Sequence, residues 1–217
     1  GLNANNISKF MGIFNGTSNF ILSKMTHEQT TFKDALEEAQ RLGFAEADPT
    51  DDVEGVDAAR KVVITSYLSF NQVIKLNDVK SVGISDITLA DINAANSLNY
   101  KIKLIGKGTY ENGYVNASVE PTLIHKNHQL AAVENEYNAI YVIGDAVGDT
   151  MFYGKGAGSL ATGSAVVSDL LNVALFFESN LHTLPPHFEL KTEETKGMMD
   201  GAEPVVIQEK SNYYIVI

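Results

Sequence analysis

A change in hydrophobic periodicity divides this sequence, and it restricts the possible folds more than any other feature. Apolar side chains recur at helical spacing over residues 32–42 and 57–68, but between residues 73 and 143 they alternate or run continuously as in strands. We expect strands at residues 101–106, 114–119, 130–134 and 139–143, with one helix at residues 89–100. Helices and strands grouped in this way predict an α+β fold: a mixed or antiparallel sheet with helices packed on one face.

The segments around this β-rich region complete the expected order of elements. Residues 11–14 predict a short strand, residues 15–19 a turn and residues 20–25 the start of a helix. After several glycines, residues 162–177 predict a buried helix. We therefore expect one domain over residues 1–183 and a polar linker over residues 184–210. The chain begins on Gly1 and ends on a β-rich run at residues 213–217, a pattern typical of a piece of a longer protein.

Charge and composition exclude several classes of function. Among 217 residues, 16 are basic and 27 acidic, which gives a net charge of −11. An acidic chain is a poor ligand for nucleic acid or an anionic membrane surface, so we expect neither as a partner. The apolar run at residues 165–177 is too short and too polar to predict a membrane span. The chain contains no cysteine, which fits a cytoplasmic protein and excludes thiolate chemistry.

An acidic loop is the first candidate functional feature. Six carboxylates fall within twelve residues, with no basic residue between them: Glu46, Asp48, Asp51, Asp52, Glu54 and Asp57. Such a run is typical of a solvated surface. A calcium loop needs a glycine at its sixth position and a glutamate at its twelfth, and counting from Asp48 these are Val53 and Ala59. A pocket for a cationic group, such as an ammonium, is the third interpretation.

A lysine and an aspartate directly after this loop form the second candidate. Asp57 and Lys61 are four residues apart, so on a helix they share one face and form an ion pair. Such a pair is often only a surface contact. Alternatively, the aspartate orients a lysine that donates or accepts a proton during catalysis.

A glycine-rich segment is the third candidate. Residues 154–158 read Gly-Lys-Gly-Ala-Gly directly before the expected helix. Glycines allow a backbone to approach a ligand closely, and a helix N-terminus favours a phosphate or carboxylate. The spacing matches neither a dinucleotide fingerprint nor a P-loop, so a structural turn remains the alternative. The five histidines form no metal-ligand pattern, and we expect no metal site in this chain.

Taken together, three of these segments resemble homoserine dehydrogenases. The resemblance rests on residues 12–22 (GIFNGTSNFIL), on residues 42–61 (LGFAEADPTDDVEGVDAARK), and on residues 153–158 (YGKGAG) followed by AVVSD at residues 165–169. The second of these segments is similar to the signature of the family. The end of the chain, residues 211–217, is similar to the first strand of the regulatory ACT domain that bacterial members often carry.

The resemblance implies a function and a set of roles. Members of this family interconvert aspartate 4-semialdehyde and L-homoserine with NADPH or NADH, in threonine, isoleucine and methionine biosynthesis. It implies a catalytic and dimerisation domain here, with a nucleotide-binding domain and most of an ACT domain outside the chain. It also implies a homodimer or dimer of dimers through the sheet, and a monovalent cation bound outside this chain. The implied site residues are the catalytic Lys61 and Asp57, the substrate-binding Glu46, Asp52, Gly16 and Thr17, and the cofactor-binding Gly156 and Gly158.

Two departures from the family pattern affect the expected site. Residues 159–163 read Ser-Leu-Ala-Thr-Gly where relatives more often show Pro-Thr-Ala, which changes the segment after the glycines. Phe44 stands where a tyrosine is common, so one hydroxyl is missing from the expected pocket. A non-catalytic, amino-acid-binding dimer module with a regulatory role is the alternative function, and it predicts binding that does not depend on Glu46 or Lys61.

Overall fold

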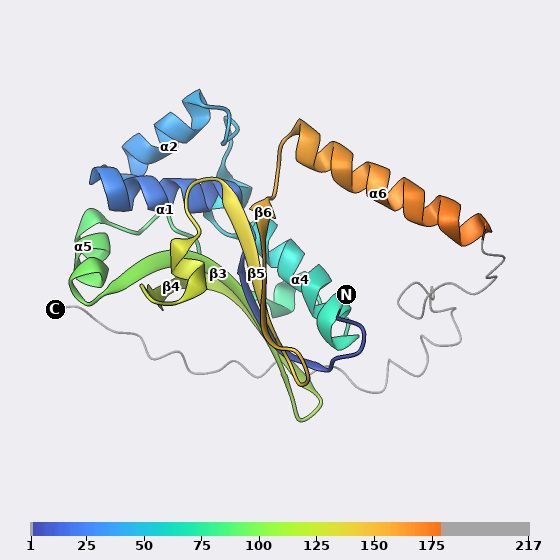
Figure 1. Ribbon diagram of the computed structural model, residues 1–217. Helices are drawn as coiled ribbons and strands as arrows, with labels where there is room; N and C mark the ends of the chain where they lie inside the picture. The colour runs from blue at the N-terminus through green and yellow to red at the C-terminus, as the bar shows by residue number, and fades with distance from the viewer. Residues whose placement is uncertain (1, 179–217) are drawn as a thin grey trace.

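The computed structural model describes residues 2–178, which form a six-stranded sheet in the order β2-β4-β3-β1-β5-β6 (Figure 1). β2 runs parallel to β4, and all other neighbouring strands are antiparallel. The sheet is therefore mixed, as expected. The strands are β1 (Ile7–Ile13), β2 (Lys80–Ser81), β3 (Tyr100–Glu111), β4 (Tyr114–His125), β5 (Tyr137–Gly144) and β6 (Gly148–Lys155).

Helices α1, α4 and α5 pack against the sheet, and α2 packs on α1 (Figure 1). The larger apolar core lies between these helices and the strands. This arrangement confirms the α+β prediction with helices packed on one face. The helices are α1 (Gly16–Glu28), α2 (Phe32–Arg41), α3 (Thr50–Val53), α4 (Val56–Phe70), α5 (Leu89–Ser97) and α6 (Ser159–Glu178), with 3₁₀ turns η1 (Leu76–Asp78) and η2 (Gln129–Ala132).

The end of β1 is fixed by aromatic packing in the core. Phe10 is fully buried, and its ring meets Phe14 edge-on at 6.2 Å and stacks on Phe70 at 5.5 Å. Aromatic pairs of this geometry contribute about 0.5–1.5 kcal/mol beyond their buried area. Because Phe14 is anchored in this way, the chain leaves β1 at a defined point and enters α1 through Asn15.

Two sequence expectations in the β-rich region are wrong. Residues 130–134 do not form a strand: they begin in η2, where the His128 ring accepts a hydrogen bond from the Leu130 backbone N–H. Leu130 is buried in the apolar cluster that also contains Ile13, so this run is apolar because it packs in the core and not because it pairs in the sheet. Conversely, residues 148–155 form β6, which pairs with β5 over its whole length. Gly148 and Gly154, near the two ends of this segment, concealed the strand.

Helix α6 also differs from its prediction. We expected a buried helix, but the helix stands off from the sheet (Figure 1), and its large apolar side chains are mostly exposed, including Leu160, Leu170 and Phe177. An apolar composition predicts burial, yet none of the described residues covers this helix. The helix over residues 159–177 is long and apolar enough to cross a membrane, judged by length and composition alone, and its mean hydropathy is 1.6. The sequence prediction of no membrane span rested on the shorter run at residues 165–177, which is too short and too polar. The expected linker, residues 184–210, and ACT-like strand, residues 211–217, lie outside the described residues.

A buried polar cluster joins β3 to the segment that precedes β5. The Lys103 side chain is almost completely buried, and its Nζ lies 3.3 Å from Glu134 Oε2. Lys101 pairs with the other oxygen of the same carboxylate. Burial lowers the pKa of Lys103 to about 8, against the attraction of Glu134. Burial raises the pKa of Glu134, but Lys103 and Lys101 outweigh it and lower that pKa to about 2. The carboxylate thus stays ionised well below neutral pH.

We predict that Glu134→Gln lowers the free energy of unfolding by about 2–3 kcal/mol at neutral pH, because the ion pairs with both lysines are lost. Glu134 has a lower pKa in the folded state than in the unfolded state, so its contribution is complete above pH 4.5 and disappears toward pH 2. Denaturant unfolding across this range checks the prediction. The difference between wild type and variant should shrink as the pH falls, and a difference that is constant from neutral pH to pH 2 would contradict it.

Candidate active site

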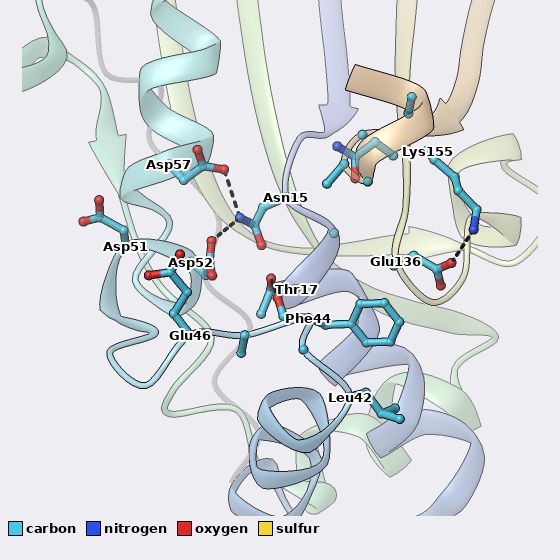
Figure 2. A pocket seen from close by; sticks show the side chains of 18 of the residues that line it. Asn15, Thr17, Leu42, Phe44, Glu46, Asp51, Asp52, Asp57, Glu136 and Lys155 are labelled. Atoms are coloured by element: carbon cyan, nitrogen blue, oxygen red, sulfur yellow. Dashed lines mark hydrogen bonds and ion pairs between the residues drawn. The ribbon is translucent and has the colours of Figure 1, made fainter. Parts of the chain in front are cut away.

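An open cleft of about 1100 Å³ lies where α1, the acidic loop, α4 and the glycine-rich segment meet. All eight site residues named from the sequence line this one cleft: Gly16, Thr17, Glu46, Asp52, Asp57, Lys61, Gly156 and Gly158. Figure 2 shows acidic side chains along one side of it, with Glu136 and Lys155 on the other. The structure therefore brings together segments that are up to 142 positions apart between Gly16 and Gly158.

The lysine and aspartate expected from the sequence are in contact. Lys61 Nζ donates a hydrogen bond to Asp57 Oδ2 at 2.7 Å and another to the Phe14 backbone carbonyl at 3.0 Å. Both residues lie on α4, and the Lys61 side chain is 43% exposed toward the cleft. The ammonium is thus oriented by two fixed acceptors and remains accessible. An exposed, oriented ammonium can stabilise negative charge on an oxygen and transfer a proton to it.

Asn15 connects the acidic loop to the start of α1, a role that the sequence had not indicated. Its Oδ1 caps the helix by accepting from the Ser18 backbone N–H at 2.8 Å. Its Nδ2 donates to Asp52 at 2.7 Å and to Asp57 at 2.9 Å (Figure 2). One buried amide therefore fixes two carboxylates relative to the helix N-terminus. Its position in a turn directly before a helix, typical of an N-cap, was the available signal.

The acidic loop is largely a wall of the cleft, although its members differ in their partners. Five of its six carboxylates line the cleft, while Glu54 instead accepts a hydrogen bond from Ser85. Asp51 pairs with Arg60. Among the described residues, the Glu46 carboxylate has no hydrogen-bond or ion-pair partner. An unpaired carboxylate beside Asp52 allows this wall to bind a cationic group such as an ammonium, with no metal ion involved.

The N-terminus of α1 forms the floor between the two sides of the cleft. Gly16 is required here by space, because a Cβ at this position would lie 2.7 Å from the Glu136 carbonyl oxygen. Thr17 donates its hydroxyl hydrogen to the Phe44 carbonyl at 2.6 Å, which ties the acidic loop to the helix. First-turn N–H groups favour an anion such as a carboxylate. Phe44, the departure noted in the sequence, places its ring against Phe20 at 4.9 Å.

The opposite side of the cleft carries Glu136, Asn138 and Lys155, of which only Lys155 falls in a segment singled out from the sequence, the glycine-rich residues 154–158. Lys155 pairs with Glu136 at 3.3 Å (Figure 2). Asn138 Nδ2 donates to the Phe14 carbonyl at 3.1 Å, so this oxygen accepts from both Asn138 and Lys61. Lys155 ends β6, whereas Glu136 and Asn138 lie beside and within β5, outside any recognisable motif. Only the pairing of the two strands shows that they meet.

Comparisons with known proteins point to one family. The family model described as Homoserine dehydrogenase matches residues 1–171.

This chain belongs to the homoserine dehydrogenase family.

Relatives of known sequence and structure carry the same name. The chain is 54% identical over 173 residues to homoserine dehydrogenase of Bacillus subtilis (strain 168), covering 80% of this chain and 40% of that protein. The crystal structure of S. aureus homoserine dehydrogenase at pH 7.5 matches with 86% identity and a TM-score of 0.78, covering 89% of this chain and 48% of that one. A hyperthermophilic archaeal homoserine dehydrogenase in complex with NADPH matches with 29% identity and a TM-score of 0.67, covering 80% of this chain and 49% of that one.

The chain thus spans less than half the length of each of these relatives. The resemblance inferred from the three sequence segments is confirmed at the level of the family. The roles of the individual site residues remain predictions.

Proposed function

We propose that this chain provides the substrate site for NAD(P)H-dependent interconversion of aspartate 4-semialdehyde and L-homoserine, in threonine, isoleucine and methionine biosynthesis. The observation that carries the proposal is the Lys61 ammonium, held by Asp57 and the Phe14 carbonyl within a cleft whose wall is acidic. The substrate is an amino acid with a reactive carbonyl at the far end of its side chain. It needs carboxylates for its ammonium and a proton donor for its carbonyl, and both are present.

Recognition of the amino-acid end is assigned to the acidic loop and α1. Glu46 and Asp52 bind the substrate ammonium, which pairs the carboxylate that has no other partner among the described residues. The substrate carboxylate lies at the N-terminus of α1, near Gly16 and Thr17, where the helix dipole favours negative charge. Both charged groups are bonded to the same substrate carbon, so these two contacts fix the orientation of the amino-acid end and direct the side-chain carbonyl toward Lys61.

Lys61 is the proton donor in the reduction. A nicotinamide cofactor, when bound, supplies the hydride that the aldehyde carbon receives. As the C=O double bond becomes a single bond, the oxygen gains negative charge, and the Lys61 ammonium stabilises this charge and donates a proton to form the alcohol. Lys61 is left as a neutral amine and regains a proton from solvent. Asp57 keeps the amine oriented through its hydrogen bond.

The glycine-rich segment fits the close approach of a flat ligand. Gly156 packs so tightly on Asn138 that a Cβ would lie 2.0 Å from Asn138 Nδ2, whereas a Cβ at Gly158 would meet no atom within 4 Å. Both glycines line the cleft, and we expect their backbone to hold NADP or NAD from one side of it. We expect the remaining cofactor contacts, and the monovalent-cation site of the family, in parts of a full-length enzyme outside this chain.

Two surfaces support the proposed assembly. The second apolar cluster lies around Ile13, Ile105 and Tyr141, with Met11 and Met151 partly exposed beside it. We propose that this region packs against a second copy, giving a homodimer or a dimer of dimers. The exposed apolar side chains of α6 are expected to pack within a longer cytoplasmic enzyme.

The regulatory-module alternative is not favoured, because every relative reported above is a dehydrogenase.

The proposed function is tested by an assay of the full-length protein with aspartate 4-semialdehyde and NADPH or NADH. Oxidation of the nicotinamide with formation of homoserine is expected. A full-length protein that binds L-homoserine but oxidises neither cofactor would contradict the proposal and favour the regulatory alternative.

We predict that Glu46→Gln in the full-length enzyme weakens L-homoserine binding by about 30-fold, because a charge-assisted contact to the substrate ammonium is lost. Isothermal titration calorimetry measures this directly. The matched control is Glu54→Gln, a change of the same type in the same loop at a carboxylate that does not line the cleft. Equal affinities for wild type and Glu46→Gln would remove Glu46 from the substrate site.

A further inference from the structure

Lys103 is a buried ammonium that the proposed chemistry does not use. It lies on β3, only 1% exposed, and its Nζ donates to the Val133 carbonyl at 2.6 Å and to Asn19 Oδ1 at 3.0 Å, besides its contact with Glu134. Burying a cation costs free energy unless it is fully paired and hydrogen-bonded. All of these contacts lead to α1 or to the residues that precede β5, so the group joins three separate segments of the fold.

The segment that Lys103 contacts is held from α1 as well. Asn19 Nδ2 lies within hydrogen-bond distance of the backbone carbonyls of every second residue in this segment: Val133 at 3.2 Å, Asn135 at 2.9 Å and Tyr137 at 3.1 Å. Ser23 Oγ accepts from the Asn135 backbone N–H at 3.1 Å. Asn19 and Ser23 are each 1% exposed. Buried polar contacts therefore hold residues 133–137 in one position relative to α1.

The same segment continues directly into the wall of the cleft. The Glu136 carbonyl packs on Gly16, where there is no room for a Cβ. One residue beyond Tyr137, Asn138 donates to the Phe14 carbonyl, the oxygen that also accepts from Lys61. A displacement of residues 133–138 would therefore break the Asn138 hydrogen bond to one of the two acceptors that orient the proposed proton donor.

We propose that Lys103 is a positioning residue for the active site: it fixes residues 133–138, and through Asn138 it fixes the Phe14 carbonyl that orients Lys61. The role in turnover rests on the proposed function. Lys103 itself does not line the cleft, so it acts only through this chain of contacts. Because proton transfer depends on distance and orientation, a small displacement of Lys61 slows turnover more than it weakens substrate binding.

The test replaces Lys103 by methionine in the full-length enzyme, with Lys101→Met as the matched control. Lys101 lies on the same strand and pairs with the same glutamate, but it makes no contact with the Val133 carbonyl. We expect Lys103→Met to lower kcat about 30-fold while KM for aspartate 4-semialdehyde changes less than about threefold. Lys101→Met should retain kcat within about twofold. A Lys103→Met enzyme that is less stable to denaturant but keeps its kcat would overturn the proposal.

A second variant decides the matter if Lys103→Met does not fold. Ser23→Ala removes the acceptor for the Asn135 N–H and the Ser23 hydrogen bond to Glu134, two contacts with the same segment. We expect kcat to fall about fivefold with KM retained. In a double-mutant cycle, Lys103→Met or Ser23→Ala should be non-additive in kcat with Asn138→Ala, because both act through the Phe14 carbonyl. An unchanged kcat in Ser23→Ala, or full additivity, counts against the proposal.

Hydrogen exchange gives a readout that does not depend on the reaction. In the full-length protein, the amides of residues 14–18 and 136–138 should exchange at least about tenfold faster in Lys103→Met or Ser23→Ala than in wild type or Lys101→Met. Faster exchange in an enzyme inactive on aspartate 4-semialdehyde would refute the proposed substrate while supporting the positioning role. Unchanged exchange would refute the positioning role whatever the substrate.

Discussion

Replacing Lys61 by alanine in the full-length enzyme is expected to lower kcat by about a thousandfold, within the range that a positioned general acid supplies. The reason is geometric: Lys61 is held by Asp57 and the Phe14 carbonyl with its ammonium open to the cleft. The fold should survive, since the Lys61 side chain is 43% exposed and a partly exposed ion pair contributes at most about 1 kcal/mol. Steady-state kinetics in the direction of aldehyde reduction measure the effect, and circular dichroism checks folding.

Two further variants separate the possible explanations of such a loss. Lys61→Arg keeps the charge but is a poor proton donor because its pKa is far above neutral, so kcat should remain at least about 100-fold below wild type. Lys24→Met removes another lysine paired with a carboxylate four residues away, outside the cleft, and should leave kcat unchanged. Near-normal turnover of Lys61→Ala, or full recovery in Lys61→Arg, is incompatible with proton donation by Lys61.

The second large effect is expected at Gly156. A Cβ there would lie 2.0 Å from Asn138 Nδ2, so Gly156→Ala must displace either the glycine-rich segment or the Asn138 side chain. Asn138 cannot move without losing its hydrogen bond to the Phe14 carbonyl. Both the cofactor contact and the orientation of Lys61 are therefore disturbed, and we expect kcat/KM for the cofactor to fall about 100-fold.

The same segment offers a matched control for this substitution. A Cβ at Gly154 would meet no atom within 4 Å, and Gly154 does not line the cleft. Gly154→Ala should therefore retain kcat/KM within about threefold, since it adds the same methyl group without a clash. Parallel kinetics with varied NADPH or NADH compare the two enzymes. If both variants were equally active, the tight packing between Gly156 and Asn138 would have no catalytic consequence.

Much of the fold could be predicted from local patterns, and the errors share one cause. Helix α2 begins after Thr31, which caps it, and ends before Gly43, as its pattern predicts. By contrast, the apolar residues around Leu130 and those of α6 are apolar for different reasons. The residues around Leu130 form a 3₁₀ turn that packs on the sheet, whereas the apolar side chains of α6 are mostly exposed in the described part of the chain. Hydrophobicity indicates that a side chain will be buried, but it does not identify the segment that buries it.

The candidate site divides in the same way. Residues in contiguous motifs, such as Asp57 and Lys61, could be named because their spacing and the family resemblance both point to them. Asn138 and Lys103 could not, since each acts through contacts with segments distant in the sequence. An asparagine or lysine in a strand carries no signal of its own until the neighbouring strands are placed.

A crystal structure of the full-length enzyme with L-homoserine bound would show directly how the substrate lies relative to Lys61. We expect the substrate hydroxyl within about 3 Å of Lys61 Nζ, in hydrogen-bond range. We also expect the substrate ammonium against Glu46 and Asp52, and its carboxylate at the N-terminus of α1. Homoserine bound in the reverse direction, or outside this cleft, would contradict the proposal.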